Sequence, residues 1–397
     1  MRLDIACSAI VDCEHKTAPI DESGDYYAVG TPAMRDHRID YAQARRISRE
    51  TFDAWTRRLR PAAGDLLLAR EAPVGPVVRL PEDANVAPGQ RTVLLRPDPA
   101  VTSSAYLYYA LRSPAAQAAL LVKAEGSTVH HLNVPDIRSF DVRIPQLPEQ
   151  QAIAEVLGAL DDKIAANTRL VDLVLTTTNS EFARRFGERG LEVPLGDLAD
   201  VVDCLHSKKP ERTSDGPPLM QLNNIRDDGL LDRGLNYPIS TEDYVEWSRR
   251  FEARAWDLVI TNVGRVGAVA RIPEGYVAAL GRNMTGIRPR DAAESGSFIA
   301  VALLSNAVRR EIELRTDAGS VMSALNVRSV PLLRLQYSSP AERRAFHDVA
   351  SPLLEAADQS LSENATLAVT RDALIPLLIS GKLRVRDAEV LVAEAGV

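Results

Sequence analysis

The sequence predicts an α+β fold in which two mixed α/β domains alternate with two long helices, and three observations point to it. Residues 148–186 carry one long helical pattern. A similar pattern returns at residues 340–380. The segments that precede the two helices repeat each other in order and spacing. We therefore expect a tandem duplication with pseudo-twofold symmetry, its helices packed as an antiparallel coiled coil.

The first long helix is predicted by a seam of residues at alternating steps of three and four. These residues are Leu157, Leu160, Ile164, Asn167, Val171 and Val174. No Pro or Gly interrupts the seam after Gly158. At about 1.5 Å per residue the helix would be roughly 55 Å long, too long for one small domain to cover. It needs a partner helix.

The repeat is clearest in three pairs of segments. ISRETFDAWTRR at 47–58 returns as ISTEDYVEWSRR at 239–250, a displacement of 192 residues. Upstream, VDCEHKTAP at 11–19 returns as VDCLHSKKP at 202–210, and downstream GDLLLAREAPVG, from Gly64, is answered by WDLVITNVGRVG, from Trp256. The preserved order indicates duplication rather than chance.

The second long helix repeats the first with an insertion. ALDDKIAAN, ending at Asn167, aligns with AADQSLSEN, ending at Asn364, now displaced by 197 residues. The insertion contains Pro352, which predicts a kink or break there. The sequence from Ser339 to Glu342 is typical of a capping box, and Gly381 suits the C-terminal end. Buried Asn at a seam fixes helix register, so the expected register residues are Leu160, Ile164, Asn167, Leu361 and Asn364.

The expected domain organisation follows from the two helices. A first globular domain takes residues 1–147, the central helix 148–188, a second globular domain 189–338, the C-terminal helix 339–382 and a tail 383–397. Strands are predicted at 65–69, 74–80, 91–95, 257–261, 266–272 and 285–288. Short helices are predicted at 51–58, 103–119 and 297–310.

Composition narrows the class of protein. Apolar residues make up 45% and charged residues 25%, as in a globular protein. The three cysteines are too few for a disulfide framework and suit a reducing compartment. No membrane span or signal peptide is recognisable, so we expect a cytoplasmic protein without membrane contact. A net charge of −7 argues against an evenly basic nucleic-acid binder and leaves room for local basic patches.

The repeated Asp-Cys-x-His segment raises the question of a metal site. It supplies Cys13 with His15, and Cys204 with His206. Zinc needs four ligands, no CxxC or HxxxH motif lies nearby, and one site shared between the halves would need the two domains face to face. We therefore expect no metal and interpret each segment as an exposed, donor-rich loop.

Two further groups of residues have side chains suited to DNA. Repeated Arg-Arg pairs can touch phosphates or form a solvated face, whereas Asn, Gln and Arg can read base edges or stabilise loops. The candidates are His15, Lys16, Arg57, Arg58, Arg70, His206, Lys208, Lys209, Gln221, Asn223, Asn224, Arg249, Arg250, Asn262, Arg265, Arg282 and Asn283. The aromatic pairs Phe52 with Trp55 and Tyr244 with Trp247 are better interpreted as anchors of a short helix than as base-stacking platforms.

Catalytic motifs are not recognisable. The sequence contains no GxxxxGK[ST] phosphate loop, no HExxH, no GxSxG and no Asn-Pro-Pro-aromatic motif. This favours a non-catalytic binding subunit.

The chain resembles the specificity subunits of type I restriction-modification enzymes over nearly its whole length. The resemblance rests on SRETFDAWTRR with GDLLLAREAPVG, on the DCxH segments, on IPQLPEQQAIAEVLGALDDKI and on RDALIPLLISGKL. It implies two target recognition domains that each read one half of a split double-stranded DNA sequence, with the helices as an antiparallel spacer. It also implies no cofactor in this chain, two partner methyltransferase subunits that use S-adenosylmethionine, and restriction subunits that translocate DNA in the full complex. The sequence departs from this pattern in the second helix, where SPAERRAF stands in place of LPEQQAIA.

Two alternatives stay open. A metal-dependent nuclease is hinted at only by Asp12 and by Glu14 with Lys16, and the second copy has Leu205 in place of Glu14. A coiled-coil scaffold whose globular domains bind protein would share the architecture but would not direct DNA methylation.

Overall fold

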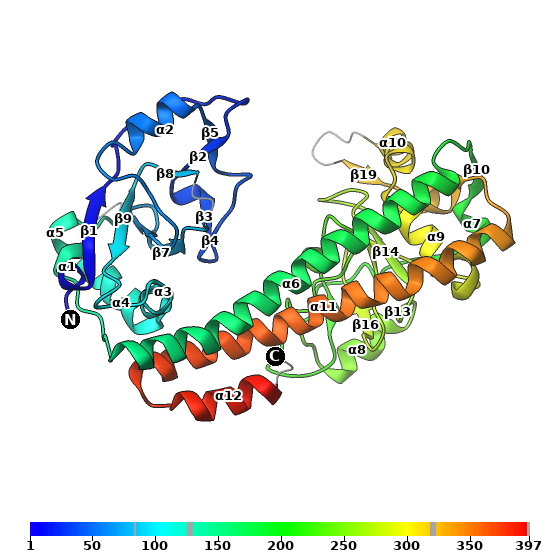
Figure 1. Cartoon of the computed structure of the whole chain (residues 1–397). Helices are drawn as coiled ribbons and strands as arrows, with labels where there is room; N and C mark the ends of the chain where they lie inside the picture. The colour runs from blue at the N-terminus through cyan, green and yellow to red at the C-terminus, as the bar shows by residue number, and fades with distance from the viewer. Residues whose placement is uncertain (83–84, 125–129, 318–322, 395–397) are drawn as a thin grey trace. The chain divides into compact units, whose positions relative to one another are not determined.

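The computed structural model describes residues 1–397 except 83–84, 125–129, 318–322 and 395–397. The chain divides into two compact units. One comprises Met1–Lys163 with Thr366–Val397, and the other comprises Ile164–Ala365. Each unit contains a sheet-bearing domain and a part of both long helices (Figure 1).

The first unit is built around a four-stranded antiparallel sheet of order β1-β9-β6-β7. A smaller sheet has the order β5-β2-β8, in which β2 runs parallel to β8, and β3 pairs with β4. The strands are β1 Cys7–Asp12, β2 Tyr26–Val29, β3 Met34–Arg35, β4 Arg38–Ile39, β5 Arg45–Ile47, β6 Leu66–Arg70, β7 Val74–Arg79, β8 Val86–Pro88 and β9 Thr92–Pro97. The helices of this domain are α1 Leu3–Ala6, the 3-10 helix η1 Thr31–Ala33, α2 Arg49–Trp55, α3 Ser104–Arg112, α4 Pro114–Lys123 and α5 Val134–Arg138.

The second unit repeats this plan. Its four-stranded sheet has the order β11-β17-β14-β15, and β12 runs parallel to β16 as β2 does to β8. The strands are β10 Leu191–Pro194, β11 Ala199–Asp203, β12 Leu219–Met220, β13 Glu252–Ala253, β14 Leu258–Thr261, β15 Val269–Arg271, β16 Ala278–Leu280, β17 Met284–Pro289, β18 Thr316–Asp317, β19 Ala324–Leu325 and β20 Arg334–Gln336. The helices are α7 Leu195–Leu198, the 3-10 helices η2 Leu222–Asn224 and η3 Val327–Leu332, α8 Thr241–Ser248, α9 Ala292–Leu304 and α10 Asn306–Leu314. The predicted duplication and fold class are confirmed.

Each four-stranded sheet is buried on both faces. Consecutive residues of the inner strands, such as Leu66, Leu67 and Leu68 in β6, are fully buried. The same holds for Leu258–Ile260 in β14. Continuous apolar runs are expected where both faces of a strand are covered, which explains why these strands were recognisable from sequence.

Two of the predicted short helices are each divided into two. Ser113 ends α3 and caps α4, because its Oγ accepts a hydrogen bond from the Ala116 N–H and Pro114 takes the first helical position. Ser305 divides α9 from α10 in the same way, accepting from the Val308 N–H. The expected single helices at 103–119 and 297–310 are thus wrong at the serines.

The two long helices are α6, Leu147–Phe186, and α11, Pro340–Ser380. Within the second unit Phe182 packs on Phe346, with ring centroids 5.7 Å apart. Farther along, the Asn167 Nδ2 donates to Glu363 Oε2 at 2.6 Å. Residue numbers fall along α11 as they rise along α6, so the helices are antiparallel.

The seam asparagines face the partner helix. Asn167 is 6% exposed, and the Asn364 Nδ2 donates to the Ile164 carbonyl oxygen at 3.3 Å. Leu361 packs against the apolar cluster of Val171 and Val174. These contacts agree with a register role, which stays a prediction.

Helix α11 is capped as expected and passes unbroken through Pro352. The Glu342 N–H donates to Ser339 Oγ, and the Ser339 N–H donates to Glu342 Oε2 at 2.9 Å. The predicted break at Pro352 is wrong. Proline removes one backbone hydrogen bond, but buried residues on the same turns, Ala350 and Leu354, hold the helix in place.

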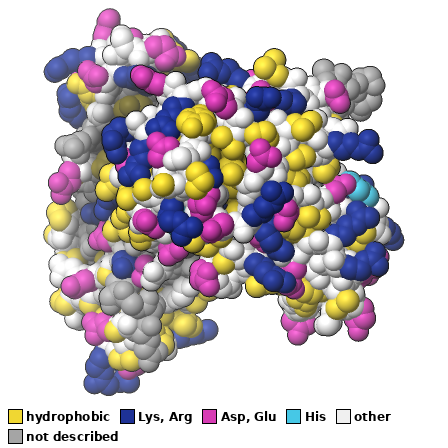
Figure 2. Space-filling view, turned by 90° about the vertical axis from the view of Figure 1, so that its right-hand side faces the viewer, with side chains coloured by type: hydrophobic (Ala, Val, Ile, Leu, Met, Phe, Trp, Pro, Cys, Tyr) yellow, Lys and Arg dark blue, Asp and Glu magenta, His cyan; other side chains and the backbone are white. Residues whose placement is uncertain are grey.

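The surface carries charges of both signs. Figure 2 shows Lys and Arg interspersed with Asp and Glu on the face in view, rather than gathered into one basic field. On this face a DNA contact would therefore have to be local. Among the described residues, no helix is long and apolar enough to cross a membrane.

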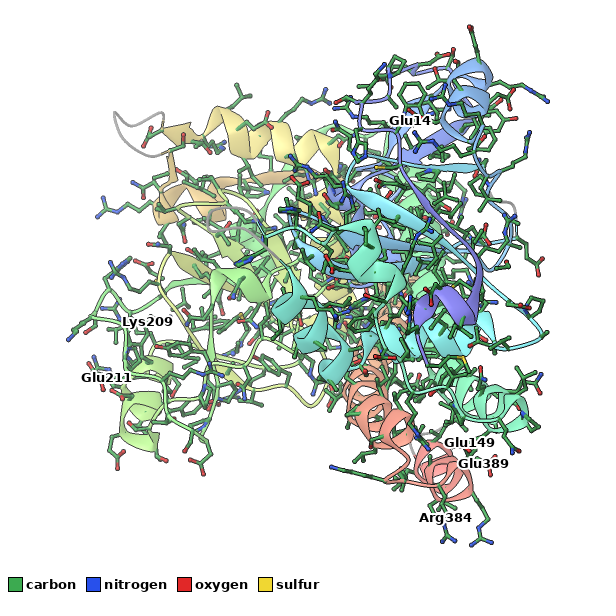
Figure 3. The ribbon with its side chains drawn as sticks, turned by 90° about the vertical axis from the view of Figure 1, so that its left-hand side faces the viewer. Glu14, Glu149, Lys209, Glu211, Arg384 and Glu389 are labelled. Carbon is green, nitrogen blue, oxygen red and sulfur yellow. The ribbon has the colours of Figure 1, made fainter. Side chains whose placement is uncertain are left out.

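A further helix, α12, Val385–Glu394, lies in the stretch expected to be a tail. It buries Ala388 and Val392, whereas Glu389, and Arg384 just before the helix, point outward (Figure 3). No helix was predicted there from the sequence, although six of its ten residues are Ala, Val or Leu.

Candidate nucleic-acid interface

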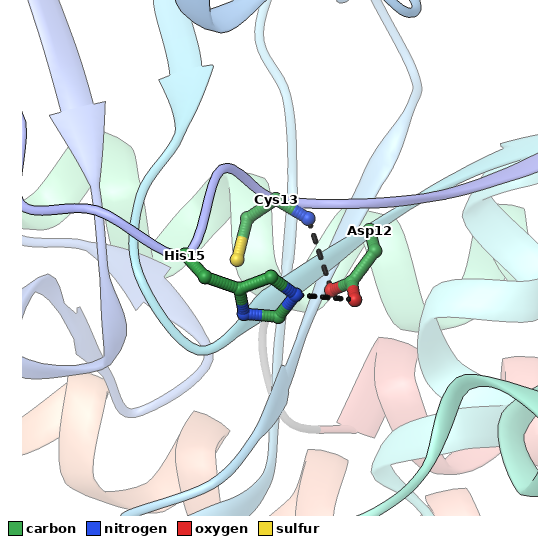
Figure 4. A group of neighbouring side chains, drawn as sticks. All are labelled: Asp12, Cys13 and His15. Carbon is green, nitrogen blue, oxygen red and sulfur yellow. Dashed lines mark hydrogen bonds and ion pairs between the residues drawn. The ribbon is translucent and has the colours of Figure 1, made fainter.

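The Asp-Cys-x-His loop of the first unit begins where β1 ends. Cys13 is buried, and its N–H still donates to the Thr92 carbonyl oxygen at 3.3 Å, so the loop starts in register with β9. His15 points outward and its Nε2 lies 2.9 Å from Asp12 Oδ2 (Figure 4). Arg58 Nη1 donates to the Asp12 carbonyl oxygen at 3.2 Å. The loop is thus fixed at both its carboxylate and its backbone.

The second unit builds the same loop after β11. His206 Nε2 lies 2.9 Å from Asp203 Oδ2, and the Cys204 N–H donates to the Met284 carbonyl oxygen at 3.3 Å. Arg250 Nη1 donates to the Cys204 carbonyl oxygen at 3.2 Å. The duplication preserved the geometry as well as the residue types.

The loops carry exposed cations. Lys16 follows His15, and Lys208 and Lys209 follow His206. Lys209 Nζ lies 3.8 Å from the centroid of the Tyr237 ring, and Figure 3 shows Lys209 on the outer surface of its domain. A lysine held over an aromatic face keeps its charge in solvent while its stem is ordered.

The Arg-Arg pairs differ in their partners between the two units. Arg57 lies 3.0 Å from Glu14 Oε1, whereas Arg249 is exposed and its unit has Leu205 at the position of Glu14. Arg58 and Arg250 are engaged by the loop backbones. The nuclease alternative loses the support of Glu14, because the carboxylate of Glu14 faces Arg57 and Arg58.

The predicted aromatic anchors behave as anchors. Phe52 is buried and stacks on Tyr26 at 4.4 Å, and Trp247 is buried against the smaller sheet of its unit. Rings held in this way are not available to stack on bases. The sequence-based interpretation is confirmed.

Two of the expected base-reading asparagines are buried in the fold. Asn224 Nδ2 donates to the carbonyl oxygens of Asp232 and Leu235, at 2.8 and 2.6 Å. Asn262 Nδ2 donates to the Leu325 carbonyl oxygen at 3.0 Å, and its Oδ1 accepts from Thr285. Their amides are used internally, so we leave both out of the proposed surface.

The remaining candidates divide by exposure. Arg70 is half-buried and its Nη1 donates to the Leu132 carbonyl oxygen at 2.9 Å. Arg265 is tied to the Ile225 carbonyl oxygen at 2.6 Å and to Asp227. The half-buried Gln221 donates to the carbonyl oxygens of the preceding strand, β12, and Asn283 takes a left-handed backbone, φ 64°, in the turn before β17. Asn223 and Arg282 are exposed.

The sequence-based reasoning did not identify the aspartates that join each domain to the long helices. Asp161 of α6 accepts from Tyr109 Oη at 2.8 Å, Arg371 Nη1 at 2.7 Å and Arg112 Nη1 at 3.3 Å. Burial alone would raise the pKa of Asp161, but Arg371 and Arg112 hold it below its usual value. In the second unit, Asp358 of α11 pairs with the fully buried Arg271. The sequence did contain a clue to these aspartates, since Asp161 and Asp358 occupy the same position of the repeat, 197 residues apart.

Comparison with known proteins agrees with this architecture. Residues 16–174 match the family described as "Type I restriction modification DNA specificity domain". The type I restriction-modification S subunit from M. genitalium aligns over 95% of both chains with a TM-score of 0.66 at 17% identity, which shows a shared fold. The HsdS subunit from Thermoanaerobacter tengcongensis aligns over 96% of both chains at 16% identity, with a TM-score of 0.36. No curated protein matches the chain.

The matched residues cover most of the first globular domain and part of α6, and the second unit repeats the sheet architecture of that domain. Residues 16–174 are thus similar to a type I restriction modification DNA specificity domain, and the chain shares the fold of a type I S subunit.

Proposed function

We propose that each globular domain reads one half of a split double-stranded DNA target, with the Asp-Cys-x-His loop as part of its DNA-facing surface. The observation that carries this proposal is the duplication itself: the same sheet order and the same arginine-fixed loop occur once in each unit. Two domains of one architecture but different surface residues suit two different half-sites. The proposed surface comprises His15, Lys16, Arg57 and Arg58 in the first unit, and His206, Lys208, Lys209, Asn223, Arg249, Arg250 and Arg282 in the second.

The long helices supply the second part of the proposal. A rigid antiparallel pair sets the spacing between two half-sites as dimer geometry does in repressors. Exposed apolar residues on the helices, Leu173 at 63% and Val369 at 71% exposure, provide contact area for the methyltransferase subunits. In this proposal S-adenosylmethionine is bound by those partners, and restriction subunits join the full complex.

The charge of the chain bears on its affinity for DNA. With a net charge of −7 and interspersed surface charges, the isolated chain is proposed to bind DNA weakly and with strong salt dependence. The methyltransferase partners then contribute much of the affinity of the complex.

The loop lysines offer a direct test of the proposed surface. Replacing Lys208 and Lys209 by Ala in the S–methyltransferase complex should lower the slope of log K against log salt by about 0.9 for each DNA phosphate that is no longer neutralised. The measurement is fluorescence anisotropy with a duplex carrying the target, at several salt concentrations. Lys382→Ala, at an exposed lysine beyond the end of α11, is the matched control. An unchanged slope in Lys208→Ala/Lys209→Ala would remove this loop from the interface.

A further inference from the structure

Each Asp-Cys-x-His loop brings a carboxylate, a thiol and an imidazole together. The ligand atoms of Asp12, Cys13 and His15 all lie within 4.8 Å of one another (Figure 4). Those of Asp203, Cys204 and His206 do the same. We propose that each trio binds one divalent transition-metal ion of the zinc class, so that the chain holds two ions.

The carboxylate changes the ligand count. Cysteine and histidine alone give each half two ligands, which is why the sequence led us to expect no metal. The structure adds Asp12 to one pair and Asp203 to the other, at the last residue of β1 and of β11. Three protein ligands with a fourth position open to water is a common zinc arrangement. Each trio lies within a single unit and needs no second domain to complete it.

The geometry is close to what a tetrahedral ion requires. Bonds of about 2.0–2.3 Å place the ligand atoms of zinc roughly 3.3–3.8 Å apart. The separations in the trio bracket this range, from 2.9 Å between Asp12 Oδ2 and His15 Nε2 to at most 4.8 Å. The His15 and His206 side chains are 60% and 59% exposed, so the rings can turn to close the difference.

The sulfur positions suit a metal thiolate. Cys13 and Cys204 are each 2% exposed, so both sulfurs lie inside their domains and not in solvent. The N–H of each cysteine donates to an equivalent turn, where the acceptor, Thr92 or Met284, follows a left-handed residue, Arg91 or Asn283. A bound cation supplies the charge that a buried thiolate needs.

Two details support a bound metal ion at these positions, beyond an Asp–His hydrogen bond that only fixes the loop. Asp203 Oδ1 is buried, and among the described residues it has no hydrogen-bond partner, as expected of an oxygen that meets a cation. Between the copies the residue inside the motif changes from Glu14 to Leu205, yet the three ligand types remain.

The two sites should differ in affinity. In the first unit Arg70 Nε lies 3.5 Å from Asp12 Oδ1, so a cation is already placed at the carboxylate. The repeat-equivalent residue in the second unit is the uncharged Asn262. The Asp203 site is therefore expected to bind the ion more tightly.

Cobalt titration of the metal-stripped full-length chain tests the proposal. We expect two equivalents of Co²⁺ to bind with sulfur-to-cobalt charge-transfer absorption, and Zn²⁺ to displace them. His206→Ala should remove the tighter site and His15→Ala the weaker. Each should lower affinity by more than the about 10–100-fold that follows when a residue supporting a metal ligand is removed. Both histidines are exposed, so these variants retain the fold.

A third variant, Cys7→Ala, is the control. It removes a buried thiol that belongs to neither trio and should leave both equivalents in place. Fewer than two thiolate-bound Co²⁺ ions in the unmodified chain, or charge-transfer bands unchanged by both histidine substitutions, would overturn the proposal. The outcome is independent of DNA binding, so it stands or falls separately from the proposed reading of half-sites.

Discussion

Lengthening both long helices by one heptad is expected to lengthen the spacer of the DNA target by about three base pairs. Seven residues add about 10.5 Å of helix, and DNA rises about 3.4 Å per base pair. The insertions belong between Lys163 and Ile164 in α6 and between Ala365 and Thr366 in α11, where the two compact units meet in sequence. Contacts inside each unit are then kept, and a full heptad preserves the seam.

The measurement is methylation mapping of cells that express the lengthened chain with the methyltransferase subunits proposed as its partners. Both half-sites should be unchanged and only their separation should grow. A four-residue insertion at the same point of α6 alone is the informative control, because it lengthens one helix without the other and puts the seam residues on its two sides out of phase. It should abolish methylation at the original site. An unaltered spacer in the heptad variant would show that the helices do not set the distance.

Replacing Asp358 by Asn should destabilise the second unit by about 3–5 kcal/mol, the usual effect of removing one partner of a buried ion pair. Arg271 is 2% exposed, and its guanidinium carbon lies 4.4 Å from the Trp256 ring centroid. Without the Asp358 carboxylate, the positive charge of Arg271 is buried without a negatively charged partner. Urea unfolding followed by Trp fluorescence reports the change directly.

Two further variants separate charge burial from packing. Burial raises the pKa of Asp358 against the opposing effect of Arg271, so desolvation of this pair is costly. The double variant Asp358→Leu/Arg271→Met should therefore recover much of the stability that Asp358→Asn removes. Arg344→Ala breaks an ion pair whose side chains are about half exposed, with Asp291 at 3.2 Å, and should cost less than about 1 kcal/mol. Equal destabilisation by Asp358→Asn and Arg344→Ala would contradict the buried-pair account.

The features predictable from the sequence were those that repeat or have a strong period. The helix seam from Leu157 to Val174 and the repeated motif at 47–58 could be predicted from residue spacing alone, because apolar spacing and duplicated residues survive divergence. Helix ends were predictable where a cap has its own chemistry, as at Ser339. Ser113 and Ser305 also cap the helices that follow them. Apolar residues on both sides of each serine continue the helical pattern, so the sequence predicted one helix where the structure has two.

The candidate site was predictable as a set of residue types but not as a surface. Asn224 and Asn262 have the side chains of base readers, and only the fold shows that their amides bond to backbone carbonyls. Conversely, Asp12 and Asp203 stand next to the cysteines in both repeats of the sequence. Only the fold shows that the rings of His15 and His206 lie beside these carboxylates, which is what makes the aspartates candidate metal ligands. Burial and side-chain direction depend on tertiary contacts, which one sequence does not specify.

The central claim, that the two globular domains read separate halves of one DNA target, is tested most directly by duplicating one domain. A chain in which residues 1–147 are replaced by a second copy of 189–338 keeps both long helices and carries two identical reading domains. Methylome sequencing of cells expressing this chain with its methyltransferase should reveal a split target made of two copies of one native half-site, at the native spacing. Methylation of the unchanged native target, with both original half-sites, would contradict the claim.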